Sequence, residues 1–118
     1  KSEMTKSPDK ESDSAFVKKL FQTAYVNFGK YSEMISLAVP QWDRERLYST
    51  DIVLIVLGMA EAAAFPEMPL RVTMNEYVEI SKFYGTPKSR AFVNGLLNGM
   101  IDKMQEEGMI VKRGKGLL

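Results

Sequence analysis

Apolar residues recur at alternating spacings of four and three across residues 15–37, which is the period of one face of a long α-helix. The stripe consists of Val17, Phe21, Ala24, Phe28, Tyr31 and Ile35, and Leu20 widens it. Pro40 ends the helix, because proline lacks the amide hydrogen that a helix interior requires. A helix with one apolar face has to bury that face against another element, so this stripe favours a helical bundle.

The second helix is expected from Thr50 to about Ala64, at the centre of the bundle. Ser49 is a suitable N-cap, and Asp51 places a negative charge in the first turn, where the helix dipole favours it. The residues that follow are apolar nearly all round, which is typical of a buried helix. The β-branched run at its start also suits a strand, but the length, the capping and the small residues after Gly58 favour a helix.

Two prolines in the loop 65–69 separate this helix from a third. The third helix is predicted from about Arg71 and has Val72, Val78 and Phe83 among the residues of one side. Gly85 then stands where a left-handed C′ residue belongs.

The last helix is predicted to begin with Thr86 as N-cap and Pro87 at the first helical position, and to run to about Glu107. Gly108 stops it. Its buried face is expected to hold Phe92, Val93, Leu96, Leu97, Met100, Ile101 and Met104. The fold class is therefore all-α: a compact bundle of four main helices, plus a short helical connector at 41–48.

The two ends of the chain are polar and differ from the middle. Residues 1–14 are predicted to be a disordered leader, residues 15–108 the helical domain, and residues 109–118 a flexible basic tail. The chain begins with lysine, so we expect it to be a fragment of a longer protein.

The composition argues against an enzyme. Cysteine and histidine are both absent, which removes disulfides, thiolate metal sites and the commonest general base. We therefore expect no catalytic residues, no metal and no cofactor. No apolar run reaches the roughly 20 residues of a membrane helix, and no signal peptide is recognisable. Gly95 and Gly99 form a GxxxG pair, which we interpret as a site of close helix packing.

Charge is unevenly distributed along the chain. Residues 41–81 carry 3 basic and 7 acidic side chains, whereas residues 82–118 carry 7 basic and 3 acidic ones. An acidic middle and a basic end would suit two partners of opposite charge, although chance segregation remains an alternative.

The junction before the last helix is the best candidate for RNA binding. The helix start offers free amides to a phosphate, Lys88 and Arg90 add positive charge, and Tyr84 or Phe92 is suited to stack on an unpaired base. The alternative is an ordinary capped junction with its aromatic side chains in the core. Asn75 and Asn94 lie among apolar neighbours, so we expect both to be buried and to bond to backbone or to each other.

Residues 69–100 resemble the C-terminal signature of the NusB family. The matching positions are Pro69, Arg71, Val72, Asn75, Glu76, Lys82, Tyr84, Gly85, Ser89, Phe92, Val93, Asn94, Gly95 and Leu97. Upstream, ERLYSTDIVLIVLGMAE at 45–61 looks like the family's Glu-Arg-Leu-Ser-x-x-Asp helix start followed by Leu-Gly-x-x-Glu. The resemblance covers about residues 15–107.

The resemblance implies a non-enzymatic, cytoplasmic bacterial factor in transcription antitermination and termination. Proteins of this family bind single-stranded boxA RNA of ribosomal RNA leaders together with NusE, a ribosomal protein, and act on RNA polymerase. The implied RNA-binding residues are Tyr84, Gly85, Lys88, Ser89 and Phe92, to which the local charge adds Arg90. The implied NusE-binding residues are Glu45, Asp51 and Glu61.

This chain departs from the family pattern at two points. The family commonly has aspartate where Lys88 stands, and its arginine-rich segment is not found in residues 1–14. Two other functions remain open. One is the NusB-like RNA-binding domain that precedes the catalytic domain of a ribosomal RNA cytosine methyltransferase. The other is a helical scaffold that binds only proteins.

Overall fold

The structure, a computed structural model, describes residues 8–39, 49–83 and 86–118. Within these ranges the chain forms four α-helices and no strand, so the all-α fold is confirmed. The helices are α2 (Pro8–Ala38), α3 (Ser49–Ala64), α4 (Leu70–Ser81) and α5 (Pro87–Glu106), followed by a short 3-10 helix, η2 (Gly114–Leu117). None of the described helices is long and apolar enough to cross a membrane. The predicted connector at 41–48 lies outside the described residues.

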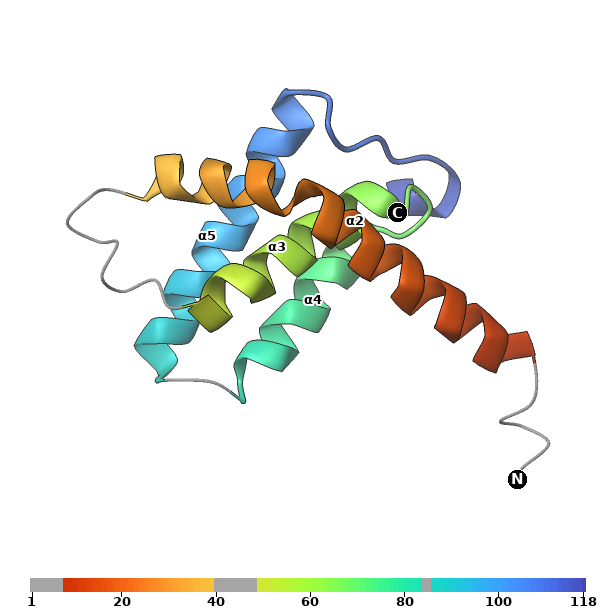
Figure 1. Ribbon diagram of the computed structural model, residues 1–118, viewed down its shortest axis with the longest axis horizontal. Coiled ribbons are helices and arrows are strands. Elements are labelled where there is room, and N and C mark those ends of the chain that lie inside the picture. Colours follow the sequence, from red (N-terminus) through yellow and green to blue (C-terminus); the bar gives the residue numbers. More distant parts are fainter. Residues whose placement is uncertain (1–7, 40–48, 84–85) are drawn as a thin grey trace.

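Helix α2 begins earlier than its sequence suggests. The predicted disordered leader is wrong for residues 8–14, which are helical from Pro8 onward. Proline is favoured at the first helical position, which suits a helix that begins at Pro8. Figure 1 shows this N-terminal part of α2 extending beyond the body formed by the other helices.

Only part of the predicted apolar stripe on α2 is buried. Leu20, Ala24, Tyr31 and Ile35 lie in the core, whereas Val17, Phe21 and Phe28 remain 46%, 55% and 43% exposed. Phe21 and Phe28 lie between the buried Leu20, Ala24 and Tyr31 along the helix. They border an open hollow together with Val53, Val56 and Leu57 of α3. Helix α3 therefore covers one edge of the stripe and leaves the other edge open.

Helix α3 is the central element, as its all-round apolar sequence predicts. It packs against α2, α4 and α5, and Ile55, Met59 and Ala60 on it are fully buried. A Cβ atom on Gly58 would lie 2.8 Å from Leu97 Cδ1, so this glycine allows α3 and α5 to approach closely.

The interpretation of Gly95 and Gly99 as a close-packing pair is wrong. Both glycines are exposed, and an added Cβ would meet nothing within 4 Å at either position. The close approach between α3 and α5 occurs instead at Gly58, on the opposite helix.

Helix α5 ends at the predicted glycine in a Schellman arrangement. Gly108 has a φ of 75°. Its amide donates to the Gln105 carbonyl at 3.1 Å, and the Met109 amide donates to the Met104 carbonyl at 2.8 Å. The chain then turns back along the bundle.

The prediction of a flexible tail from residue 109 is wrong. Residues 109–118, called the C-terminal strap below, lie against the α3–α4 loop: Arg113 N donates to Pro66 O at 3.0 Å, and Lys112 Nζ donates to Phe65 O at 2.8 Å. A Cβ atom on Gly116 would collide with the Pro66 carbonyl oxygen, so only glycine fits there. The residues that the strap contacts lie more than 40 positions upstream, so the sequence near the tail could not reveal these contacts.

Candidate nucleic-acid interface

Helix α4 ends in a tightened turn that presents a phenylalanine to solvent. The Lys82 amide donates to Glu79 O at 3.2 Å, and the Phe83 amide donates to Ile80 O at 3.1 Å. Phe83 is 86% exposed. The tightened turn carries Phe83 past the last point at which α4 contacts the core.

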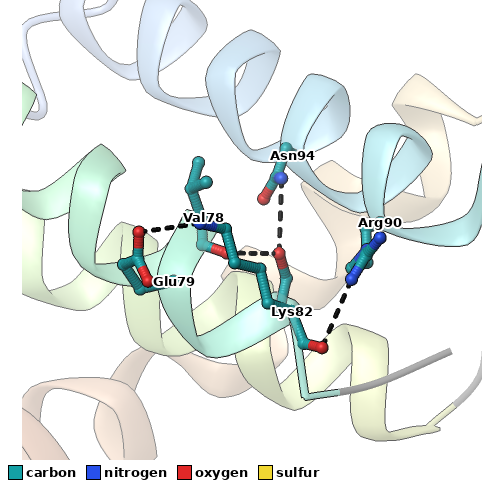
Figure 2. A network of polar contacts seen from close by, with 6 residues as sticks. Val78, Glu79, Lys82, Arg90 and Asn94 are labelled. Carbon is teal, nitrogen blue, oxygen red and sulfur yellow. Dashed lines mark hydrogen bonds and ion pairs between the residues drawn. The ribbon is translucent and has the colours of Figure 1, made fainter. Parts of the chain in front are cut away.

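A polar contact joins α4 to α5 just before this turn (Figure 2). Ser81 Oγ donates to Val78 O at 2.8 Å and accepts from Asn94 Nδ2 at 3.3 Å. Because the serine proton is used on Val78, the amide nitrogen of Asn94 has to face Ser81. Asn94 Oδ1 is then buried with no hydrogen-bond partner among the described residues, which costs about 1–3 kcal/mol.

The expected partnership of Asn75 and Asn94 is therefore corrected. Asn94 bonds to Ser81, and Asn75 is exposed rather than buried. The buried residues of α4 are Thr73, Tyr77 and Ser81, which are spaced by four, and Asn75 lies on the opposite side of the helix.

Arg90 forms a second link between the two helices (Figure 2). Its Nη1 donates to the Lys82 carbonyl at 3.3 Å. Lys82 Nζ in turn lies 3.0 Å from Glu79 Oε2, in an exposed pair that contributes little to stability. Between the helices lies an open hollow of about 330 Å³, lined by Val78, Ser81, Lys82, Pro87, Arg90, Ala91 and Asn94.

The start of α5 is electropositive. Lys88 is exposed in its first turn, and that turn contains no acidic residue. The positive end of the helix dipole and the free first-turn amides add to this charge. Lys82, Lys88 and Arg90 therefore gather at the end of α4 and the start of α5.

The predicted RNA-binding residues differ in where they lie in the structure. Lys88 and Arg90 lie at the junction. Tyr84 and Gly85 lie outside the described residues, as does the side chain of Ser89. Phe92 is half-buried and packs against the core, which matches the alternative structural interpretation for this ring. Phe83 is an exposed aromatic residue at this junction that was not among the predicted residues, and no local signal in the sequence marks it as exposed.

The predicted acidic site is largely inside the fold. Asp51 lies in the first turn of α3 but is only 8% exposed, and Glu61 is 2% exposed. Thr73 Oγ1 donates to Glu61 Oε2 at 2.9 Å across the α3–α4 contact. A partner protein would not reach Glu61 without opening the bundle. Glu45 lies outside the described residues.

The pKa of Glu61 is raised to about 7, mainly by burial and next by a hydrogen bond with the carboxyl group of Glu76, against a lowering effect of Thr73. Burial and the two nearby carboxylates also raise the pKa of Tyr77. Burial lowers the pKa of Lys112, and attraction to Glu61 opposes that effect. Within the described ranges no cluster of acidic side chains is arranged to hold a metal ion.

Comparison with known proteins links this arrangement to one family. The profile of the NusB family matches residues 1–102. A relative named transcription antitermination protein NusB, from Salinibacter ruber, is 30% identical over 103 residues, which cover 87% of this chain and 64% of the relative. A protein of the same name from Chloroherpeton thalassium is 30% identical, with 87% and 49% covered.

A third protein of that name, from Bacillus licheniformis, is 33% identical over 92 residues, which cover 78% of this chain and 71% of the relative. The chain spans less than two thirds of the length of the first two relatives. No solved structure matches it.

Proposed function

Because the chain belongs to the NusB family, we propose that it acts in transcription antitermination by binding single-stranded RNA at the α4–α5 junction. One observation carries the proposal: Lys82, Lys88 and Arg90 gather at the N-terminus of α5, next to the exposed ring of Phe83. Free amides and cations favour phosphate, and unpaired bases favour an exposed aromatic ring.

The family resemblance makes the proposal more specific. We infer a boxA-like RNA as the ligand and NusE as the protein partner. Tyr84, Gly85 and Ser89 remain RNA-binding candidates on the strength of the family motif alone. Phe92 contributes by anchoring α5 to the core. Lys88 replaces the aspartate common in the family, so this chain should hold phosphate more strongly there.

NusE is proposed to bind near the start of α3. The acidic middle of the chain complements a basic ribosomal protein, and Asp51 with Glu45 remain the candidate contacts. Glu61 is a structural residue in this proposal, because its carboxyl group is bonded to Thr73 inside the α3–α4 contact. Asp51 lies in the first turn of α3 and keeps 8% of its surface exposed. Asp51→Asn keeps the side-chain shape and should weaken NusE binding, as measured by calorimetry. Unchanged affinity would remove Asp51 from the interface.

The RNA proposal is tested by titrating the 118-residue chain with a boxA-like oligonucleotide over a range of salt concentrations, with and without NusE. The affinity should fall as salt rises. Lys88→Glu should weaken binding and reduce the slope of log K against log salt by about 0.7, the effect of one phosphate on a single strand. Lys30→Glu makes the same charge change at an exposed site on α2 and should have no such effect.

Two results would contradict RNA binding at this junction. Absence of salt-sensitive binding, even with NusE present, would favour a scaffold that binds only proteins. Equal slopes for the wild-type chain and Lys88→Glu would place the RNA elsewhere on the surface.

A further inference from the structure

Phe83 is a large apolar ring that the fold leaves in water. It is 86% exposed, and Ile80, one turn earlier on the same side of α4, is 37% exposed. The neighbouring helical residue Tyr77 is buried, so α4 itself has a well-defined core face from which Phe83 is excluded. An exposed aromatic ring of this kind is suited to bind a partner through its face.

The backbone beneath this ring is held in place. The Phe83 amide is bonded to Ile80 O at 3.1 Å. The peptide group that joins Lys82 to Phe83 accepts a hydrogen bond from Arg90 Nη1 at 3.3 Å (Figure 2). Asn94 and Ser81 fasten the same two helices one turn deeper. A ring on such a base is oriented before any ligand arrives, which reduces the entropy cost of binding.

The hydrogen bond from Arg90 also holds a positive charge close to the Phe83 ring. Because its guanidinium group lies against the Lys82–Phe83 peptide, a positive charge is located at the base of the aromatic side chain. A guanidinium group has five N–H donors, so donors remain for a phosphate oxygen. Lys88 adds a second exposed cation, and the first turn of α5 supplies no carboxylate to oppose it.

We propose that Phe83 is a stacking platform for one unpaired base of a single-stranded RNA, with Arg90 and Lys88 binding the adjoining phosphates. The inference rests on the proposed RNA-binding function and assigns to it a contact residue that lies outside the family motif. An aromatic ring flanked by cations is the arrangement by which single strands are bound without base pairing. A protein partner would need acidic groups to satisfy the same cations, which is the alternative the test addresses.

The experiment uses the 118-residue chain and a single-stranded RNA that carries 2-aminopurine, whose fluorescence reports stacking directly. Phe83→Ala should weaken binding by roughly 5- to 150-fold, the loss expected for one aromatic–base stack, and should abolish the fluorescence change. Phe83→Trp keeps a ring and should keep both. Tyr25→Ala is the matched control, because Tyr25 is 85% exposed on α2, away from the junction.

The outcomes separate this inference from the function on which it rests. Wild-type RNA binding that is salt-sensitive but unchanged by Phe83→Ala overturns the stacking platform and leaves the proposed function standing. If Phe83→Ala leaves RNA affinity unchanged and weakens NusE binding, the stacking platform is also overturned, and the ring is a protein contact. Absence of any RNA binding by the wild-type chain overturns both. Circular dichroism of each variant verifies that the helices are intact.

Discussion

Replacing Glu61 with glutamine should stabilise the folded chain at neutral and alkaline pH. Glu61 is 2% exposed, accepts a hydrogen bond from Thr73 at 2.9 Å, and shares a carboxyl–carboxyl hydrogen bond with Glu76. Glutamine has the same shape and no charge. Its carbonyl can accept from Thr73 and its amide can donate to Glu76, so the substitution preserves the contacts and removes only the ionisation.

The size of the effect follows from the raised pKa. The pKa of Glu61 is about 7 in the folded chain, against an ordinary value of 4.5. Between these values the folded chain retains a proton that the unfolded chain has lost, so stability falls as pH rises through this window. Each pKa unit corresponds to about 1.4 kcal/mol, which gives a loss of roughly 3 kcal/mol above pH 7. This is an upper bound, because Lys112 and the strap can shift toward the carboxylate.

The assay is urea unfolding followed by circular dichroism at several pH values between about 5 and 8. Glu61→Gln should exceed the wild-type chain by less than about 1 kcal/mol near pH 5 and by up to roughly 3 kcal/mol at pH 8. Glu79→Gln is the control, since it makes the same substitution in an exposed ion pair with Lys82. If the wild-type chain and Glu61→Gln show the same pH dependence, the carboxyl is not held in its neutral form and the reasoning fails.

Glycine substitutions give two further predictions, both measured by urea unfolding. Gly58→Ala should destabilise the folded chain by about 1–3 kcal/mol, because the added Cβ would lie 2.8 Å from Leu97 in the core. Gly95→Ala, in open space on the surface of α5, should stabilise the folded chain by about 0.5–1 kcal/mol. Equal effects of the two substitutions would show that α3 and α5 are not in close contact. Gly116→Ala should release the C-terminal strap from Pro66 and speed tryptic cleavage within residues 109–118, and cleavage at the wild-type rate would show that the strap is not docked there.

The helices themselves could be placed from local chemistry. Pro87 and Gly108 marked both ends of α5, because each residue has a backbone preference that acts within one or two positions. The central place of α3 followed from its composition, since a helix that is apolar on all sides has to be surrounded. The positive charge of the candidate site was also visible, because Lys88 and Arg90 are close in sequence.

Other features depended on where distant segments meet. The apolar stripe of α2 is buried at Ala24 and exposed at Phe21, because α3 covers one edge of the stripe and leaves an open hollow along the other. The sequence suggested an exposed charge at Glu61, but α4 places Thr73 within hydrogen-bond distance of its carboxyl group. The sequence suggested a flexible tail, but Gly116 packs directly against Pro66.

Sequence alone therefore determined the helical segments apart from the first residues of α2, where α5 starts and stops, and which family motif the chain carries, since these depend on residues near one another. Only the tertiary structure decided which apolar and charged side chains face water. It exposed Phe83 and buried Glu61, because burial is set by the lengths and crossings of helices that lie far apart in the chain. The proposed RNA surface combines both sources: a basic helix start that can be read locally, and an exposed ring that required the fold.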